Sequence, residues 1–213
     1  MAATTLAPVR ELVPARALHP IRVLEQCAAA VLLLALAPAM LAIAIAIWVL
    51  SRRSPLIAHL RVGQYGRPLW VLKFRTMWQG RGSGLVERVV TSADTLKSED
   101  DARVTSRLAR WCRRYSIDEL PQLWQVARGE MSFVGPRPIT AAELDRHYGL
   151  HAREVLRARP GLTGLWQARG RNRLTYRRRL RLDLFLVRHY SAALYATVLL
   201  WTVPRVLRGT DAW

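Results

Sequence analysis

The chain has 213 residues, enough for one domain with a buried core. Its net charge of +18 comes from 33 Lys and Arg against 15 Asp and Glu, and nearly all of the basic residues are Arg. Arginine suits anionic groups, so nucleic acid, anionic lipid or phosphorylated substrates are the expected partners, although a codon preference would raise the same count. The two cysteines exclude a disulfide framework and a zinc finger, and they fit a reducing compartment.

The first predicted element is an apolar segment from Cys27 to Leu50, which contains no charged residue. As a straight helix it would be about 36 Å long, enough to cross a bilayer. Pro38 lies in its middle, where proline kinks a helix, and Arg residues flank both ends. Because Arg-rich flanks favour the cytoplasmic side, we predict a re-entrant helix over residues 22–53, broken at Pro38. A spanning helix with a proline kink is the alternative.

The next predicted element is a small β-hairpin over residues 56–74, with Gly63 and Gly66 around its turn. The polar stretch 78–103 is rich in Gly, Ser and Asp and is predicted to be a loop. Its glycine cluster lacks the strand–GxGxxG–helix spacing of a dinucleotide site.

The rest of the chain is predicted to be mainly helical. We expect helix over 103–128 with an interruption near Ser116, a turn with a short extended piece and a proline loop over 129–138, and helix over 140–157. A glycine-rich loop follows. From Thr175 onward, apolar and basic residues recur at helical spacing, which predicts amphipathic helices that lie in a membrane interface or pack on the domain. The predicted fold class is mainly α with a small β-hairpin.

Two adjacent carboxylates, Asp118 and Glu119, lie in the segment SIDELPQLW. Ser116 and Glu119 match a capping box, which would explain the pair structurally, and Asp118 could serve as the cap itself. A carboxylate can also attack phosphorus and form an acyl-phosphate, and its neighbour can hold Mg²⁺ or move a proton. Such a site needs fixed cations for the phosphate oxygens.

Two motifs can supply these cations. KFRTM places Lys73 and Arg75 on one face of the predicted strand, because side chains alternate along a strand. GPRP holds Arg137 between two prolines, which restrict the backbone around it. Each residue alone would be read as a surface charge, but together with the acidic pair they predict a phosphate-binding site.

These motifs occur in a fixed order after the apolar segment: KFRTM, SIDELPQLW, GEMSFVGPRP and RPGLTGLWQARGRNRLTY. In this order they resemble the bacterial sugar transferases, the monotopic polyprenyl-phosphate phosphoglycosyl transferases that start exopolysaccharide and O-antigen synthesis. The resemblance covers about residues 22–213. It implies a tail over 1–21, the re-entrant helix over 22–53, and a cytoplasmic catalytic domain over 54–213 with interfacial C-terminal helices.

The resemblance also implies an activity and its residues. Hexose-1-phosphate would move from a UDP-sugar to undecaprenyl phosphate at the cytoplasmic face of the bacterial inner membrane, with release of UMP. Asp118 would be the nucleophile, Asp118 and Glu119 would be the Mg²⁺ ligands, Glu119 could instead act as acid or base, and Arg137 would contact phosphate. The expected partners are the two substrates and inner-membrane lipids, with no nucleic acid beyond the donor nucleotide, and a homodimer is left open.

The sequence departs from the family at four positions: Ala37 before the proline, Gln125 where relatives often carry Asn, and Tyr195 and Thr197 in place of an acid and a lysine. They bear on sugar specificity and C-terminal packing more than on the chemistry. Glucose or galactose is the expected sugar, with an N-acetylated sugar left open. A non-catalytic basic membrane protein that binds anionic lipid or nucleic acid, or an inactive relative, is the alternative.

Overall fold

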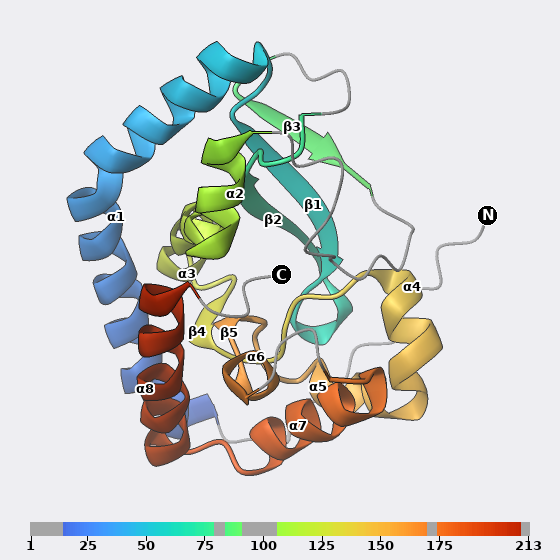
Figure 1. Cartoon of the computed structure of the whole chain (residues 1–213). Helices are drawn as coiled ribbons and strands as arrows, with labels where there is room; N and C mark the ends of the chain where they lie inside the picture. Colours follow the sequence, from blue (N-terminus) through green and yellow to red (C-terminus); the bar gives the residue numbers. More distant parts are fainter. Residues whose placement is uncertain (1–14, 79–83, 91–105, 170–173, 210–213) are drawn as a thin grey trace.

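The computed structural model describes residues 15–78, 84–90, 106–169 and 174–209. A long helix, α1 (Ala15–Ser51), runs along one side of a domain that contains two small sheets and shorter helices (Figure 1). The strands are β1 (Leu56–Val62), β2 (Pro68–Phe74), β3 (Val86–Val89), β4 (Ser132–Val134) and β5 (Gly161–Thr163). The helices after α1 are η1 (Gln64–Gly66), α2 (Arg107–Arg114), η2 (Ile117–Gln122), α3 (Leu123–Ala127), α4 (Ala141–Glu143), η3 (Leu144–Tyr148), η4 (Gly149–His151), α5 (Ala152–Val155), α6 (Leu165–Arg169), α7 (Tyr176–Arg188) and α8 (Ala192–Arg208).

Helix α1 continues through Pro38 without interruption, so the predicted break in the helix is not observed. Instead, the helix curves along the side of the domain (Figure 1). A proline removes one backbone hydrogen bond, and the remaining bonds of a long helix can keep it helical across the kink. The part from Ile21 to Ser51 is long and apolar enough to cross a membrane and is largely exposed. Re-entrant insertion stays a prediction.

One side of α1 packs on the domain. Ala29 is fully buried in a cluster with residues of β2, α3 and the turn before β4: Leu69, Val71, Val126 and Met131. Many large apolar side chains elsewhere on α1 are exposed, including Leu34, Leu41 and Trp48. Exposed apolar surface of this extent marks a membrane or partner contact.

The first sheet has the strand order β2-β1-β3. β1 and β2 pair antiparallel, with Leu56 opposite Phe74 and Val62 opposite Pro68, which confirms the predicted hairpin. β3 pairs parallel to β1, so the loop prediction is wrong for its four residues. A strand this short carries too little alternation to be recognised from sequence. Most of the remaining predicted loop lies outside the described residues.

The side chain of Gln125 ties α3 to β2, an edge strand of this sheet. Its amide oxygen accepts a hydrogen bond from the Leu72 N–H at 3.0 Å, and its amide nitrogen donates to the Trp70 carbonyl at 2.9 Å. Gln125 is buried and extends the hydrogen bonding of the sheet at a strand edge that would otherwise lack partners. This contact fixes the distance between β2 and the η2–α3 segment, which carry several of the candidate site residues.

The second sheet consists of β4 and β5, which run parallel with Ser132 opposite Gly161 and Val134 opposite Thr163. The short extended piece predicted within 129–138 is confirmed. The segment after Pro160 was expected to be a loop, and there the prediction is wrong, since it forms β5 and α6. Gly135 and Gly161 face each other so closely that a Cβ on Gly161 would lie 2.1 Å from the Gly135 nitrogen. Their lack of side chains is what permits this pairing.

The two remaining helical predictions hold with interruptions. The helix predicted over 140–157 begins with a capping box between Thr140 and Glu143 and is broken near Gly149, where φ is +48°. The segment from Thr175 forms α7 and α8, with Ser191 capping α8. Whether these helices lie in a membrane interface stays a prediction.

A buried carboxyl group in α7 makes the stability of the domain depend on pH. Asp183 is fully buried and accepts a hydrogen bond from the Tyr148 hydroxyl at 2.9 Å. Burial raises the pKa of Asp183 to about 7. In the unfolded chain this carboxyl would titrate near about pH 4. Between these values the folded protein binds the extra proton, so the free energy of unfolding falls as pH rises from about 4 to about 7.

We therefore expect Asp183→Asn, which stays neutral at every pH, to flatten this dependence. Chemical denaturation in detergent micelles at several pH values between about 4.5 and 8 measures it. Asp145→Asn is the matched control, since Asp145 is exposed and its change should leave the slope in place. An unaltered slope in Asp183→Asn would assign the pH dependence to another group.

Candidate active site

The carboxylate pair lies on η2, a 3-10 helix that follows an abrupt change of backbone direction. Ser116 has φ +56°, in the left-handed region, and its side chain makes no capping hydrogen bond. The capping-box interpretation of the pair is therefore wrong for Ser116, although the Glu119 N–H does donate to the Ser116 carbonyl at 3.1 Å. A non-glycine residue in this region costs roughly 1–3 kcal/mol and is kept where the surrounding structure holds it.

Glu119 is paired with two cations from different parts of the chain. The Lys73 ammonium, on β2, lies 2.5 Å from Glu119 Oε1, and the Arg137 guanidinium, which follows β4, lies 3.7 Å from the same oxygen. All three side chains are largely buried. The structure thus brings three of the predicted site residues into contact.

Asp118 lies beside Glu119 on η2 and is only 5% exposed. Its negative charge reaches Cys112 on α2. Burial, and secondarily this charge, raises the pKa of Cys112 to about 11. Because the thiolate is the reactive form of cysteine, Cys112 stays an inert thiol at neutral pH and does not compete with Asp118 as a nucleophile.

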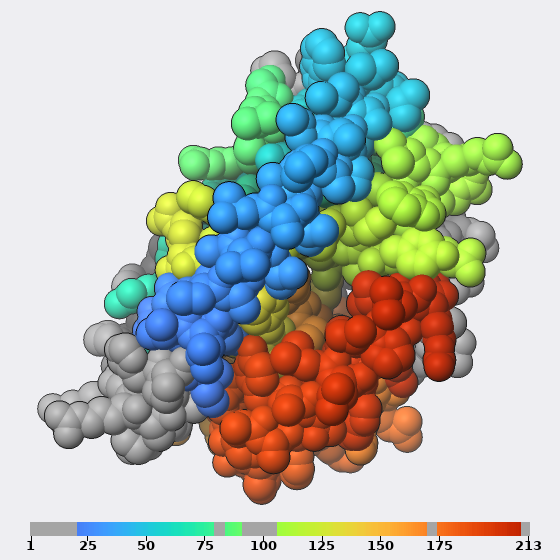
Figure 2. All heavy atoms as spheres, turned by 90° about the vertical axis from the view of Figure 1, so that its left-hand side faces the viewer, coloured from blue at the N-terminus to red at the C-terminus, as the bar shows by residue number. Residues whose placement is uncertain are grey.

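Two pockets meet at the carboxylate pair. The first, of about 650 Å³, lies among α1, α2 and α8 and is mostly apolar, with Leu36, Trp111, Leu199 and Val206 in its walls. A recess between these three helices is visible in Figure 2. The second, of about 250 Å³, lies among β1, β2, η2 and α7. The residues that line both pockets are Arg113, Asp118, Glu119, Arg137, Leu162 and Trp166.

The second pocket is cationic. The basic side chains in its walls are Arg61, Lys73, Arg75, Arg113, Arg137 and Arg179. Burial lowers the pKa of Arg61, partly offset by the nearby Glu143. Such a density of positive charge in a partly enclosed space favours a ligand with several negative charges, such as a diphosphate.

Trp166 organises two of these guanidinium groups. Arg179 lies 4.7 Å and Arg137 lies 6.0 Å from the centre of its ring, and Arg179 also contacts the ring of Tyr176. Contacts of a guanidinium with aromatic faces hold its orientation without neutralising its charge. Both guanidinium groups are thereby oriented in the wall of the cationic pocket, where Arg137 also pairs with Glu119 and Arg179 donates to the Leu174 carbonyl.

Arg75 differs from the other predicted cations. Its side chain is 2% exposed, donates from Nε to the Ser54 carbonyl at 2.7 Å, and forms an ion pair with Glu87 on β3. It lines the cationic pocket, but its contacts hold β2, β3 and the chain after α1 together. A phosphate contact by Arg75 stays a prediction.

Arg113 and Arg179 are pocket residues that the sequence analysis did not select. Arg113 is 3% exposed and lies in both pockets, but it stands in a run of basic residues before the acidic pair, where the sequence does not distinguish one arginine from the next. Arg179 lies within a run of basic residues in α7, where no single arginine stands out. The one signal for Arg179 in the sequence was its spacing of four residues from Asp183, which makes the two side chains neighbours on a helix.

The predicted Mg²⁺ ligands, Asp118 and Glu119, fit a restricted form of metal site. No group of three His, Cys, Asp or Glu side chains that could hold a metal occurs among the described residues. Mg²⁺, however, is commonly bound by one or two carboxylates together with substrate phosphates and water. The pair on η2 suits that arrangement, and the cationic pocket provides the place for the phosphates.

The fold and site define a protein with a long, exposed apolar helix and a carboxylate pair between an apolar and a cationic pocket. The family model described as "Bacterial sugar transferase" matches residues 17–209, and the chain therefore belongs to the bacterial sugar transferase family.

Three bacterial relatives have similar sequence identities to this chain. The chain is 39% identical to a UDP-galactose-lipid carrier transferase of Erwinia amylovora, over 81% of this chain and 38% of that protein. It is 38% identical to an exopolysaccharide production protein of Rhizobium meliloti, over 87% of this chain and 84% of that protein. It is 39% identical to a UDP-glucose:undecaprenyl-phosphate glucose-1-phosphate transferase of Caulobacter vibrioides, over 90% of this chain and 71% of that protein. The chain thus spans well under half the length of the Erwinia relative.

Proposed function

We propose that the protein transfers a hexose-1-phosphate from a UDP-sugar to undecaprenyl phosphate and releases UMP, as the first membrane step of exopolysaccharide or O-antigen synthesis. The observation that carries this proposal is the meeting of an apolar and a cationic pocket at Asp118 and Glu119. A lipid phosphate acceptor needs the first kind of pocket, and a nucleotide diphosphate donor needs the second. The names of two relatives, which specify UDP-galactose for one and UDP-glucose and undecaprenyl phosphate for the other, support the same substrates.

The transfer proceeds in two displacements at one phosphorus atom. A carboxylate oxygen of Asp118 attacks the phosphorus that bears the sugar, and the bond to the bridging oxygen breaks as UMP leaves. The resulting aspartyl-phosphosugar is then attacked by an oxygen of the lipid phosphate, which restores the carboxylate and yields a lipid diphosphosugar. Two easier steps thus replace one difficult transfer.

The cations stabilise the charge that develops on the phosphate oxygens. Arg113 and Arg137 line both pockets, so they can contact phosphate in either half of the reaction. Lys73 neutralises Glu119 and keeps a second negative charge from repelling the donor. Mg²⁺ held by the carboxylate pair and the donor would supply further charge neutralisation.

The apolar helix α1 and the basic residues around it support a site at a membrane surface, and we propose the cytoplasmic face of the inner membrane. UDP-sugars are made in the cytoplasm, where the cationic pocket would meet them. Glucose or galactose is the proposed sugar, supported by the relatives named for them.

The deciding experiment measures UMP release from a panel of UDP-sugars with the full chain, undecaprenyl phosphate and Mg²⁺, and with a chelator as the metal-free arm. We expect Leu199→Trp, which fills the apolar pocket, to raise the KM for undecaprenyl phosphate by about tenfold and to leave the single-turnover UMP burst without acceptor unchanged.

Leu200→Trp is the matched control, because Leu200 is the next residue on α8 and is 72% exposed. If the two substitutions raised the KM equally, the acceptor would not bind in the apolar pocket. No UMP release with any donor, combined with steeply salt-dependent nucleic-acid binding, would instead favour the non-catalytic alternative.

A further inference from the structure

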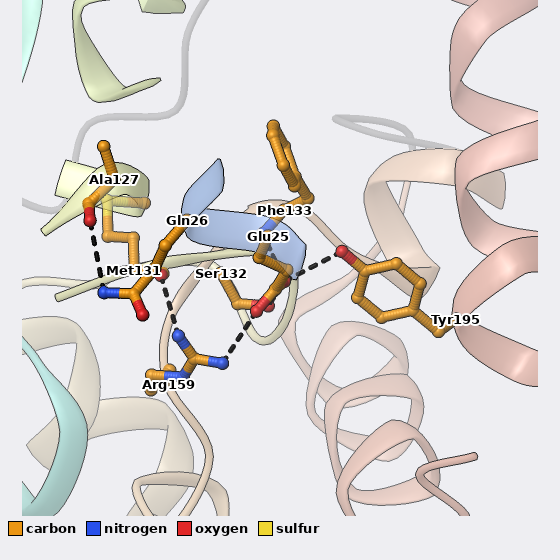
Figure 3. Close-up of polar contacts among 8 residues, drawn as sticks. All are labelled: Glu25, Gln26, Ala127, Met131, Ser132, Phe133, Arg159 and Tyr195. Carbon is orange, nitrogen blue, oxygen red and sulfur yellow. Dashed lines mark hydrogen bonds and ion pairs between the residues drawn. The ribbon is translucent and has the colours of Figure 1, made fainter. Parts of the chain in front are cut away.

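An acidic side chain near the start of α1 is buried inside the catalytic domain. Glu25 is 3% exposed and accepts hydrogen bonds from three other parts of the chain (Figure 3). Its Oε1 accepts from the Phe133 N–H at 3.0 Å, from the Tyr195 hydroxyl at 2.8 Å and from the Ser132 hydroxyl, and its Oε2 accepts from the Arg159 guanidinium at 2.7 Å. Four donors from β4, the residue before Pro160 and α8 thus converge on one carboxylate.

This arrangement suits an ionised carboxylate. A buried charge is tolerated where an opposite charge and hydrogen-bond donors satisfy it, and Arg159 with three neutral donors provides both. Burial and the charge of Glu25 raise the pKa of Tyr195, so this hydroxyl keeps its proton and remains a donor. Tyr195, noted in the sequence as a departure from the family, therefore has a defined partner on α1.

The network leads directly to the phosphate site. Ser132 and Phe133 begin β4, and the same strand ends at Val134, three residues before Arg137. Arg159 lies two residues before β5, and its carbonyl would be 2.3 Å from a Cβ on Gly135. The backbone of Arg159 is therefore tightly packed against Gly135. We expect a movement of β4 or of Arg159 to displace Arg137 as well.

Two backbone hydrogen bonds join the residues that follow β4 to β5. The Gly135 N–H donates to the Thr163 carbonyl at 2.9 Å, and the Gly161 N–H donates to the Pro136 carbonyl at 2.8 Å. Arg137 follows at once and reaches Glu119 and the ring of Trp166. The path from α1 to Arg137 thus consists of a charged hydrogen-bond network and a tightly packed strand pair.

We propose that Glu25 is a positioning residue that sets the place of Arg137 through β4 and β5, so that the seating of α1 controls the geometry of the phosphate site. As regards catalysis, this inference rests on the proposed function. It differs from a general docking role, in which Glu25 would only hold α1 against the domain.

The neighbouring Gln26 provides the matched control. Its amide donates to the Ala127 carbonyl at 3.2 Å, so it also holds α1 to the domain, but at the end of α3 rather than at β4 (Figure 3). Glu25→Gln removes the charge and leaves at least one of the four donors without an acceptor. Gln26→Met removes the contact to α3 and leaves β4 untouched.

The first test is independent of activity. Hydrogen exchange of the peptide that covers residues 132–137 is measured on the full chain in detergent or nanodiscs. We expect Glu25→Gln to speed the exchange of these amides by about tenfold and Gln26→Met to leave it within about twofold. Equal exchange in the two variants would overturn the inference, whether or not the protein proves to be a transferase.

The second test uses UMP release. We expect Glu25→Gln to lower kcat/KM for the donor by about tenfold, and Gln26→Met to change it less than about twofold. In an Arg137→Lys background, which keeps a cation and a measurable rate, Glu25→Gln should lower kcat/KM by less than about twofold, because its effect passes through Arg137. A full tenfold loss in that background would show that Glu25 does not act through Arg137. A wild-type protein that released no UMP would refute the proposed function, and the exchange experiment would then decide the role of Glu25.

Discussion

Asp118→Asn is expected to lower the rate of UMP release by on the order of 10³-fold or more, because an amide cannot replace the carboxylate as the attacking group. The substitution preserves shape at a side chain that is only 5% exposed, so the fold should remain intact. The measurement is the single-turnover UMP burst with donor alone, followed by intact-protein mass spectrometry. The wild-type protein should carry one sugar phosphate, and the variant should carry none.

Asp145→Asn provides the comparison, since it makes the same chemical change at an exposed residue outside both pockets and should keep full activity. Near-normal turnover by Asp118→Asn would contradict a covalent mechanism at this residue. A sugar-phosphate adduct on another side chain would identify that side chain as the nucleophile instead of Asp118.

Gly161→Ala is expected to lower the free energy of unfolding by about 3 kcal/mol or more, the largest effect on stability that we predict. The added Cβ would lie 2.1 Å from the Gly135 nitrogen and 2.4 Å from the Thr163 carbonyl oxygen. Both are backbone atoms of the strand pair and cannot turn aside as a flexible side chain could. Chemical denaturation in detergent micelles, followed by circular dichroism, measures the loss.

Gly149→Ala separates this clash from the ordinary cost of replacing a glycine. Gly149 has a positive φ, unlike Gly161, and an added Cβ there would meet no atom within 4 Å. Its loss should stay at roughly 1–2 kcal/mol, from backbone strain alone. If Gly161→Ala were no worse than this control, the close approach of β4 and β5 would be wrong.

The parts of the fold that the sequence predicts are those with a local signal. Alternating apolar residues around Gly63 and Gly66 identify the β1–β2 hairpin, and the change of pattern near Ser116 marks the break before η2. β4 and β5 have three residues each, and their pairing depends on two glycines 26 positions apart that must meet. A contact of that kind has no local signature in a single sequence.

The candidate site divides in the same way. Lys73, Asp118, Glu119 and Arg137 stand in distinctive motifs, and the structure brings them together. Glu25 was overlooked because it precedes a long apolar run and was assigned to the membrane segment as a whole. An acidic residue two positions before the uncharged run from Cys27 to Leu50, in a chain with only 15 acids, is a signal that a buried partner accounts for.

Leu36 of α1 forms part of the wall of the apolar pocket. This contact limits how the protein could have evolved. An anchor that merely tethered a domain to a bilayer could be replaced by an acyl chain or an unrelated hydrophobic tail. Here α1 forms part of the wall of the pocket beside Asp118, and about three turns earlier its Glu25 is hydrogen-bonded inside the domain. We therefore expect α1 and the domain to be inherited as one unit, because a domain joined to an unrelated helix would lack the part of the pocket wall that Leu36 forms.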